Sequence, residues 1–232
     1  MSAKSPLPLS KYCRQTAEAA KAASYQLASL DASVKNTWLT ESAGALITSA
    51  DLIMKANQRD LAAASEYELS SAAIDRLRLD TERIGGIASG LLEIATLPDP
   101  VGEVMDGFTR PGGLQIQKKR VPLGVVFFIY ESRPNVTADA AGICVKSGNA
   151  VILRGGKEAI HSSQAIVNIL AATAKRCGVP EAAVQLVETT DRAAVGHFLG
   201  HHELIDVTIP RGGESLIRRV AKEATMPVIK HY

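Results

Sequence analysis

Apolar residues recur at helical spacing through the first hundred positions of the chain. They lie three and four positions apart over residues 39–54, and the pattern returns over residues 72–92. This spacing places apolar side chains on one face of a helix, which can then pack against a core. The Leu-Pro-Asp-Pro segment at 97–100 ends the helical region, because proline lacks an N–H group and restrains the preceding residue. We therefore expect N-terminal helices within residues 1–103.

The pattern changes to a two-residue period after these helices. Residues 105–110 and 114–121 flank Pro111-Gly112-Gly113, and apolar side chains at 114 and 116 alternate with polar ones. Two such segments around a short glycine-containing loop predict a β-hairpin over residues 104–121. One face of this hairpin is predicted to be solvated or available to a partner.

From Leu123 onward, patterns typical of strands and helices alternate. Apolar runs predict strands at Val125–Ile129, 150–153, 184–187 and 204–209, with a further strand starting at 227. Helical spacing occurs at 158–175, 191–199 and 213–222. This alternation requires crossover connections and hence a mostly parallel sheet. The predicted fold class is α/β: a doubly wound, Rossmann-like sheet with N-terminal helices and a protruding hairpin, its core in residues 122–232.

Composition narrows the function classes. The formal net charge of the 232 residues is +2, and aromatic residues make up 4%. These values argue against a nucleic-acid or membrane partner. No apolar run reaches the length of about 18 residues expected of a membrane-spanning helix, and the first residues lack the apolar core of a signal peptide. We expect a cytoplasmic protein.

The cysteines predict neither a disulfide framework nor a metal site. Cys13, Cys144 and Cys177 are odd in number, and their spacing is not that of metal ligands. The histidines are not grouped with them, so a zinc site is not expected. Reduced thiols are the simplest interpretation.

Three loops follow predicted strands, at 130–135, 154–158 and 210–214. Ligands of parallel sheets bind beyond the carboxyl ends of the strands. Each loop contains an arginine, and two contain a Gly-Gly pair. Glycines that open a helix expose N–H groups, to which the helix terminus adds partial positive charge. The loops therefore predict a phosphate-bearing ligand, although the common dinucleotide and P-loop motifs are absent from the sequence.

Asn135 follows Arg133-Pro134 and starts a predicted helix. Its side chain can act as the N-cap of that helix. Alternatively, its amide can face a carbonyl oxygen that becomes negative during nucleophilic attack. The residues alone leave both interpretations open.

The segments YESRPNV, GNAVILRGG, IPRGG and PVIKH together resemble the γ-glutamyl phosphate reductases, or glutamate-5-semialdehyde dehydrogenases, of the aldehyde dehydrogenase superfamily. The resemblance extends from the N-terminal helices through His231. It implies NADPH-dependent reduction of γ-glutamyl phosphate to glutamate 5-semialdehyde and phosphate in proline biosynthesis. It also implies a homo-oligomer formed through the hairpin, with glutamate 5-kinase as a further partner.

The resemblance assigns Asn135 to the place of the superfamily's oxyanion asparagine. It places Arg154, followed by Gly155 and Gly156, at the adenosine ribose, where an arginine suits the 2′-phosphate of NADP.

The other implied contacts involve phosphate and substrate charge. Gly212 and Gly213 open the helix near the cofactor pyrophosphate, and Arg211 contacts a phosphate or is a surface arginine beside a turn. Arg133 and Lys146 are candidate partners of substrate charge, although Lys146 is also interpretable as a solvated helix residue.

In this family a cysteine thiolate attacks the acyl phosphate, and the thioester then accepts hydride. That cysteine lies in a Ser-Thr-Cys loop beyond the PVIKH-like segment, and no cysteine of this chain matches it. The resemblance thus implies a cofactor domain without its catalytic domain, inactive alone, with an exposed sheet edge. The alternatives are a truncated nucleotide-binding or assembly module and a generic phosphate-binding α/β protein.

Overall fold

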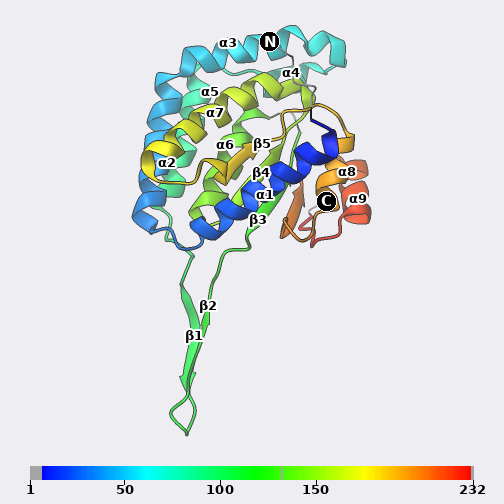
Figure 1. The fold of residues 1–232 in the computed structure, drawn as a ribbon. Helices are drawn as coiled ribbons and strands as arrows, with labels where there is room; N and C mark the ends of the chain where they lie inside the picture. Colours follow the sequence, from blue (N-terminus) through cyan, green and yellow to red (C-terminus); the bar gives the residue numbers. More distant parts are fainter. Residues whose placement is uncertain (1–6, 132, 231–232) are drawn as a thin grey trace, which may run out of the picture.

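The computed structural model describes residues 7–131 and 133–230 (Figure 1). The end of the resemblance at His231 lies outside the described residues. The N-terminal region forms helices, as expected. They are α1 (Leu9–Leu27), α2 (Ala32–Thr48), α3 (Ala50–Ala62), the 3-10 turn η1 (Ala64–Tyr67), α4 (Ser71–Leu77) and α5 (Thr81–Thr96).

The second apolar run forms two helices rather than one. Arg78 is extended and ends α4, and Asp80 begins α5 by accepting a 2.8 Å hydrogen bond from the Arg83 N–H. A carboxylate at this position stabilises a helix start. The break matters because residues on both sides of it line the larger cavity described below.

The central sheet contains only parallel pairings among its named strands, in the order β5-β4-β3-β6. Its strands are β3 (Val125–Ile129), β4 (Ala150–Arg154), β5 (Val184–Leu186) and β6 (Val207–Pro210). The connections are α6 (Pro134–Lys146), η2 (Lys157–Ala159), α7 (Ile160–Cys177), η3 (Glu181–Ala183) and α8 (Ala193–Leu199), and α9 (Glu214–Glu223) follows β6. The predicted α/β fold class is confirmed.

Helices cover both faces of the sheet (Figure 1). On one face α1 contacts β3, β4 and β5, while α6 contacts β4 and α7 contacts β5 on the other. An outer layer of α2, α3 and α5 packs on α6 and α7. The Trp38 indole N–H donates to the Leu170 carbonyl at 3.1 Å, which joins this layer to α7. Every residue of β4 is buried, as expected of a strand covered on both faces.

Two predicted strands are shorter in the structure. The strand expected over 204–209 begins at Val207. The strand expected from 227 is a single parallel bridge between Thr208 and Val228. The apolar pattern was insufficient to set these boundaries, since strand assignment also requires a hydrogen-bonded neighbour.

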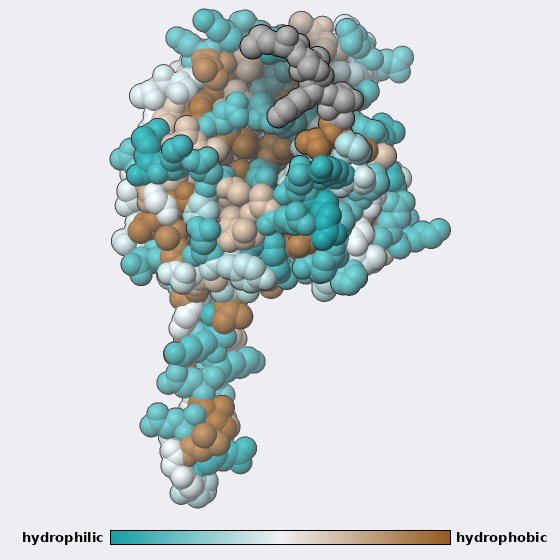
Figure 2. All heavy atoms as spheres, in the orientation of Figure 1, coloured by the Kyte–Doolittle hydropathy of each residue, from teal (hydrophilic) through white to brown (hydrophobic). Residues whose placement is uncertain are grey.

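The predicted hairpin protrudes from the body of the molecule (Figure 1). Its antiparallel strands are β1 (Val104–Thr109) and β2 (Gln115–Lys119), and all their residues are exposed. Apolar side chains near its tip form the brown patch in Figure 2, with Phe108, Leu114 and Ile116 among the exposed residues. Within the described residues, no helix has the length and apolarity required to cross a membrane.

Candidate functional site

The structure brings the three predicted loops together at the carboxyl edge of the sheet. Ile129, at the end of β3, is paired with Arg154 on one side and Pro210 on the other. The Tyr130 N–H donates to the Arg154 carbonyl at 3.0 Å, and the Arg211 N–H donates to the Ile129 carbonyl at 2.7 Å. Residues from three separate segments therefore meet around the end of β3.

Tyr130 connects the sheet to α6 and explains the glycine that follows Arg154. Its buried hydroxyl lies 2.7 Å from the Thr137 hydroxyl, and burial raises the pKa of the phenol. A Cβ atom on Gly155 would lie 3.2 Å from this ring. The tight contact favours glycine at 155 even without a ligand.

Arg154 is buried beneath the loop that it begins. Its guanidinium donates to the Gly155 carbonyl at 2.9 Å and to the Thr190 carbonyl at 3.1 Å. Its Nε is buried and has no partner among the described residues. Burial lowers the pKa of this guanidinium, against the opposing effect of nearby Tyr12 and Glu158. A buried donor without a partner is rare in folded proteins, and an anion or a ribose hydroxyl of a ligand would satisfy it.

A groove continues from Arg154 between α8 and α9. A cavity of about 180 Å³, lined by Arg154, Gly155 and Gly156, shares Arg192, Val195 and Leu216 with a second cavity of about 400 Å³. Apolar walls with cationic rims fit a planar base attached to phosphates. The residues therefore fit a dinucleotide such as NAD(P).

Sequence reasoning missed two cations of this groove, Arg192 and Arg219. Arg192 lies in the segment after β5, and this position after a strand could have identified it as a candidate ligand-binding residue. Arg219 lies within α9 and gave none.

The amino terminus of α9 already holds a carboxylate. The Gly213 N–H donates to Glu131 Oε1 at 2.8 Å. An additional Cβ on Gly212 would lie 2.9 Å from the same oxygen. The Gly213 N–H thus binds an anionic group of the chain itself, and a phosphate bound there would have to displace Glu131. Arg211 is exposed beside this pair.

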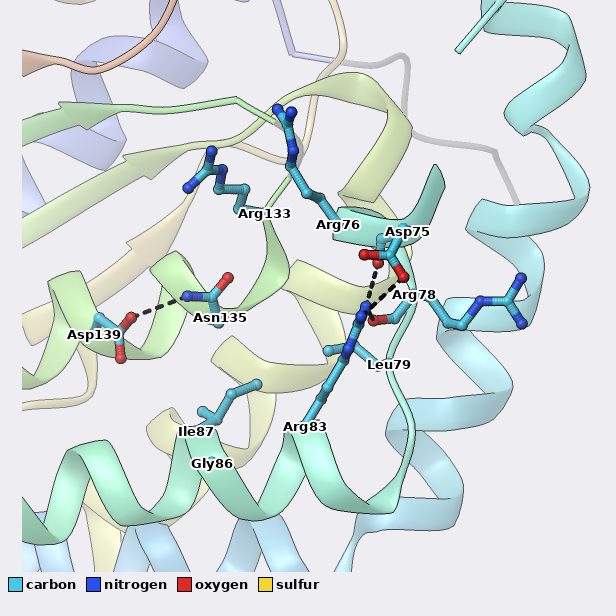
Figure 3. A pocket seen from close by; sticks show the side chains of 10 residues that line it. All are labelled: Asp75, Arg76, Arg78, Leu79, Arg83, Gly86, Ile87, Arg133, Asn135 and Asp139. Carbon is cyan, nitrogen blue, oxygen red and sulfur yellow. Dashed lines mark hydrogen bonds and ion pairs between the residues drawn. The ribbon is translucent and has the colours of Figure 1, made fainter. Parts of the chain in front are cut away.

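A larger cavity of about 570 Å³ lies where α4 and α5 meet the start of α6 (Figure 3). It contains the predicted residues Arg133 and Asn135. Its lining residues are Asp75, Arg76, Arg78, Leu79, Arg83, Gly86, Ile87, Arg133, Asn135 and Asp139.

Asn135 is not the N-cap of α6, so that interpretation is wrong. The helix begins at Pro134 with Arg133 as its N-cap, since proline is favoured at the first helical position. The Asn135 amide instead donates to Asp139 Oδ2 at 3.2 Å, on the side of the cavity (Figure 3). Burial raises the pKa of Asp139, and the Asn135 hydrogen bond partly opposes this. An amide has two N–H donors, so one remains for a ligand oxygen.

Lys146 lies outside this cavity, and its prediction as a solvated residue is wrong. The side chain is buried and donates to Asn36 Oδ1 at 2.6 Å and to the Ala95 carbonyl at 3.0 Å. These partners from α2 and α5 compensate the loss of water around the ammonium group.

The cysteines are poor nucleophiles in this fold. Burial raises the pKa of Cys144 to about 12 and that of Cys13 to about 11, and it also raises the pKa of Cys177. Nucleophilic cysteines require a lowered pKa, because the thiolate is the reactive form. Across the described part of the chain, no cluster of three or more metal-ligating side chains is found.

Comparison with known proteins gives the family. The γ-glutamyl phosphate reductase of Rhodopirellula baltica is 69% identical over 224 residues, which cover 97% of this chain and 52% of that protein. The enzyme of the same name from Caldanaerobacter subterraneus subsp. tengcongensis is 53% identical, covering 92% of this chain and 52% of its own length. The chain therefore spans about half the length of these curated relatives.

Solved structures agree with the sequence comparison. The crystal structure of γ-glutamyl phosphate reductase from Thermotoga maritima matches with a TM-score of 0.91 and 36% identity, over 93% of this chain and 52% of that chain. An NAD-dependent benzaldehyde dehydrogenase from Corynebacterium glutamicum shares the fold, with a TM-score of 0.74 and 19% identity, over 96% of this chain and 46% of that chain. Residues 6–232 match the aldehyde dehydrogenase family, and the chain belongs to that family.

Proposed function

We propose that this chain is the cofactor-binding part of a cytoplasmic enzyme that reduces γ-glutamyl phosphate with NADPH, releasing glutamate 5-semialdehyde and phosphate for proline biosynthesis. One observation carries the proposal: a pocket with Arg133 and Asn135 and a nucleotide-sized groove with Arg154 flank the same end of β3. The relatives named γ-glutamyl phosphate reductase support this assignment of substrate.

In this proposal the groove residues hold NADPH, which supplies hydride when bound. Arg154 contacts the adenosine ribose and its 2′-phosphate, and the glycines at 155 and 156 let the chain approach closely. The Gly212–Gly213 segment and Arg211 bind the pyrophosphate after Glu131 has moved from the Gly213 N–H. The residues of this chain thus bind and orient the cofactor.

Asn135 acts on the acyl group. Its free amide N–H donates to the carbonyl oxygen that gains negative charge when a nucleophile attacks. The nucleophile is a thiolate from outside residues 1–232, because burial disfavours ionisation of the three thiols within them. Arg133 binds a negatively charged group of the substrate.

The hairpin is proposed to join subunits into a homo-oligomer. Phe108, Leu114 and Ile116 are exposed near its tip, and a two-stranded ribbon by itself is marginally stable in water. Association with glutamate 5-kinase stays a prediction of the resemblance.

The test measures NADPH oxidation by the complete protein that contains this chain, with γ-glutamyl phosphate as substrate. We expect turnover that depends on both compounds, and a lower rate with NADH. A folded protein that binds NADPH but does not oxidise it in the presence of γ-glutamyl phosphate would contradict the proposed reaction. Saturable NADPH binding without turnover would instead favour the non-catalytic nucleotide-binding module.

A further inference from the structure

The cavity at the start of α6 is lined by more charged side chains than a reaction at an acyl group requires. Arg76 and Arg133 are exposed in this cavity and extend toward the same edge in Figure 3. Among the described residues, neither guanidinium has a hydrogen-bond or ion-pair partner. Two unpaired guanidinium groups in one concave site are typical of a carboxylate or phosphate subsite.

A third arginine, Arg83, already has partners and holds the segment that carries Arg76. Arg83 Nη2 donates to Asp75 Oδ1 at 2.9 Å, and its Nη1 donates to the carbonyls of Arg78 and Asp75. These bonds neutralise Asp75 and tie the end of α4 to α5. Arg83 is therefore a positioning residue rather than a free anion-binding group.

The backbone after Arg76 is also held by hydrogen bonds from the Asn57 side chain. Asn57 is buried, its amide donates to the Leu77 carbonyl at 2.8 Å, and its oxygen accepts from the Leu79 N–H at 2.8 Å. Satisfied buried amides of this kind hold a backbone in one conformation. The backbone that carries Arg76 is thus preorganised, which reduces the entropy lost on ligand binding.

Asp139 supplies a negative charge on another side of the same cavity. It is partly buried, and the Asn135 amide is its hydrogen-bond partner; no cation pairs with it among residues 7–131 and 133–230. A partly desolvated carboxylate without a cation is unfavourable. A cationic group of a ligand would relieve this cost.

We propose that this cavity binds the α-amino-acid head group of the substrate, with Arg76 and Arg133 on the α-carboxylate and Asp139 on the α-ammonium. The inference rests on the proposed function and adds recognition of the non-reacting end. An amino-acid zwitterion carries an ammonium and a carboxylate group on one carbon atom, whereas a phosphate dianion would be repelled by Asp139. The volume of about 570 Å³ is ample for a five-carbon amino acid.

The complete enzyme tests this in the oxidative direction, in which the aldehyde and inorganic phosphate are separate substrates. Arg76→Gln and Asp139→Asn are each expected to raise KM for glutamate 5-semialdehyde about 10- to 100-fold, the effect of losing a charged hydrogen bond. KM for phosphate is expected to stay within about twofold of wild type, since in this proposal the charges of the cavity contact the head group and not phosphate.

Two truncated aldehydes separate the roles of the charges. With 4-aminobutanal, which lacks the α-carboxylate, Arg76→Gln is expected to have little effect. With 5-oxopentanoate, which lacks the α-ammonium, Asp139→Asn is expected to have little effect. Arg59→Gln is the matched control, because it removes the same charge from an exposed arginine of α3 that does not line the cavity.

Each contrary outcome has a distinct meaning. If Arg76→Gln and Asp139→Asn behave like Arg59→Gln while wild-type activity is normal, the head-group subsite is refuted and the proposed function stands. If the variants raise KM for phosphate instead, the cavity is a phosphate subsite and the inference is wrong. A folded wild-type enzyme that is inactive on the semialdehyde refutes both. Unchanged NADPH affinity of each variant confirms that it has folded.

Discussion

The two ends of α6 differ in whether their charged side chains have partners within the protein. At its carboxyl end, Lys146 is buried and bonded to Asn36 and Ala95, next to the ion pair of Lys35 and Asp99. At its amino end, Arg133 and Asn135 are exposed, and the Asp139 carboxylate is bonded to an amide rather than a cation. Charges with protein partners serve the fold, whereas charges without them are available to a ligand.

The largest expected effect is a loss of stability when the ion pair near the buried carboxyl end of α6 is broken. Asp99→Asn leaves the fully buried Lys35 ammonium without its carboxylate, which is expected to lower the free energy of unfolding by about 3–5 kcal/mol. Urea denaturation measures this loss. Asp106→Asn on the exposed hairpin is the control with the same chemical change. A loss below about 1 kcal/mol would erase the contrast between the two ends of α6.

A large effect on the reaction rate is expected from substitution of Asn135 at the exposed amino end of α6. Asn135→Ala in the complete enzyme is expected to lower kcat on the order of a hundredfold or more, because one oxyanion donor is lost. Asn135→Asp tests the donor directly, since a carboxylate can only accept hydrogen bonds. Unfolding curves close to wild type would separate this loss from a folding defect. A near-normal kcat for Asn135→Ala would exclude it as oxyanion donor.

An effect of intermediate size is expected in the groove, because Arg154 is buried and its Nε has no partner among the described residues. Arg154→Ala is expected to weaken NADPH binding about tenfold and NADH binding less, since the 2′-phosphate distinguishes the two cofactors. Fluorescence titration with both cofactors measures the difference. Equal losses would mean that Arg154 acts through its bonds to the Gly155 and Thr190 carbonyls and not on the 2′-phosphate.

The smallest expected effect is a gain in stability, and it is expected when the charge of Asp139 is removed. Burial raises the pKa of Asp139, so the folded state holds this proton more tightly than the unfolded state. Stability therefore falls as pH rises from the ordinary pKa of an aspartate through the raised one, and the penalty persists at neutral pH.

Asp139→Asn removes that penalty. The variant is expected to be more stable than wild type at neutral pH, by less than about 1 kcal/mol because the carboxyl remains partly solvated. The gain is expected to disappear in acid, where the wild-type carboxyl is protonated. Urea denaturation at both pH values measures it. A destabilised variant at neutral pH would mean that Asp139 serves the fold, as Asp99 does.

Local signals were sufficient for much of the fold. The structure has β3 at the predicted bounds, because five apolar residues lie between Gly124 and Tyr130 without a polar interruption. The hairpin followed from its alternation and its glycine loop. The break between α4 and α5 was missed, since helical spacing continues through it and the decisive cap of Asp80 is a single hydrogen bond.

Tertiary partners decided the rest. Lys146 is bonded to groups 110 and 51 residues away in the sequence, so its residue type alone suggested solvent. The loops with Arg133, Arg154 and Arg211 were predictable because parallel strands end at one edge. The cavity shared by Arg76 and Asp139 was not predictable, since its walls come from α4, α5 and α6, which only the tertiary fold brings together.

The hairpin gives the molecule a place where sequence can change without consequence for the sheet. All residues of β1 and β2 are exposed, and a Cβ atom on Gly112 would meet no other atom within 4 Å. Exposed loop tips of this kind accept insertions readily. A peptide tag or a fluorescent reporter introduced at the tip would leave the charged cavity and the groove untouched, and it would probe the proposed contact between subunits.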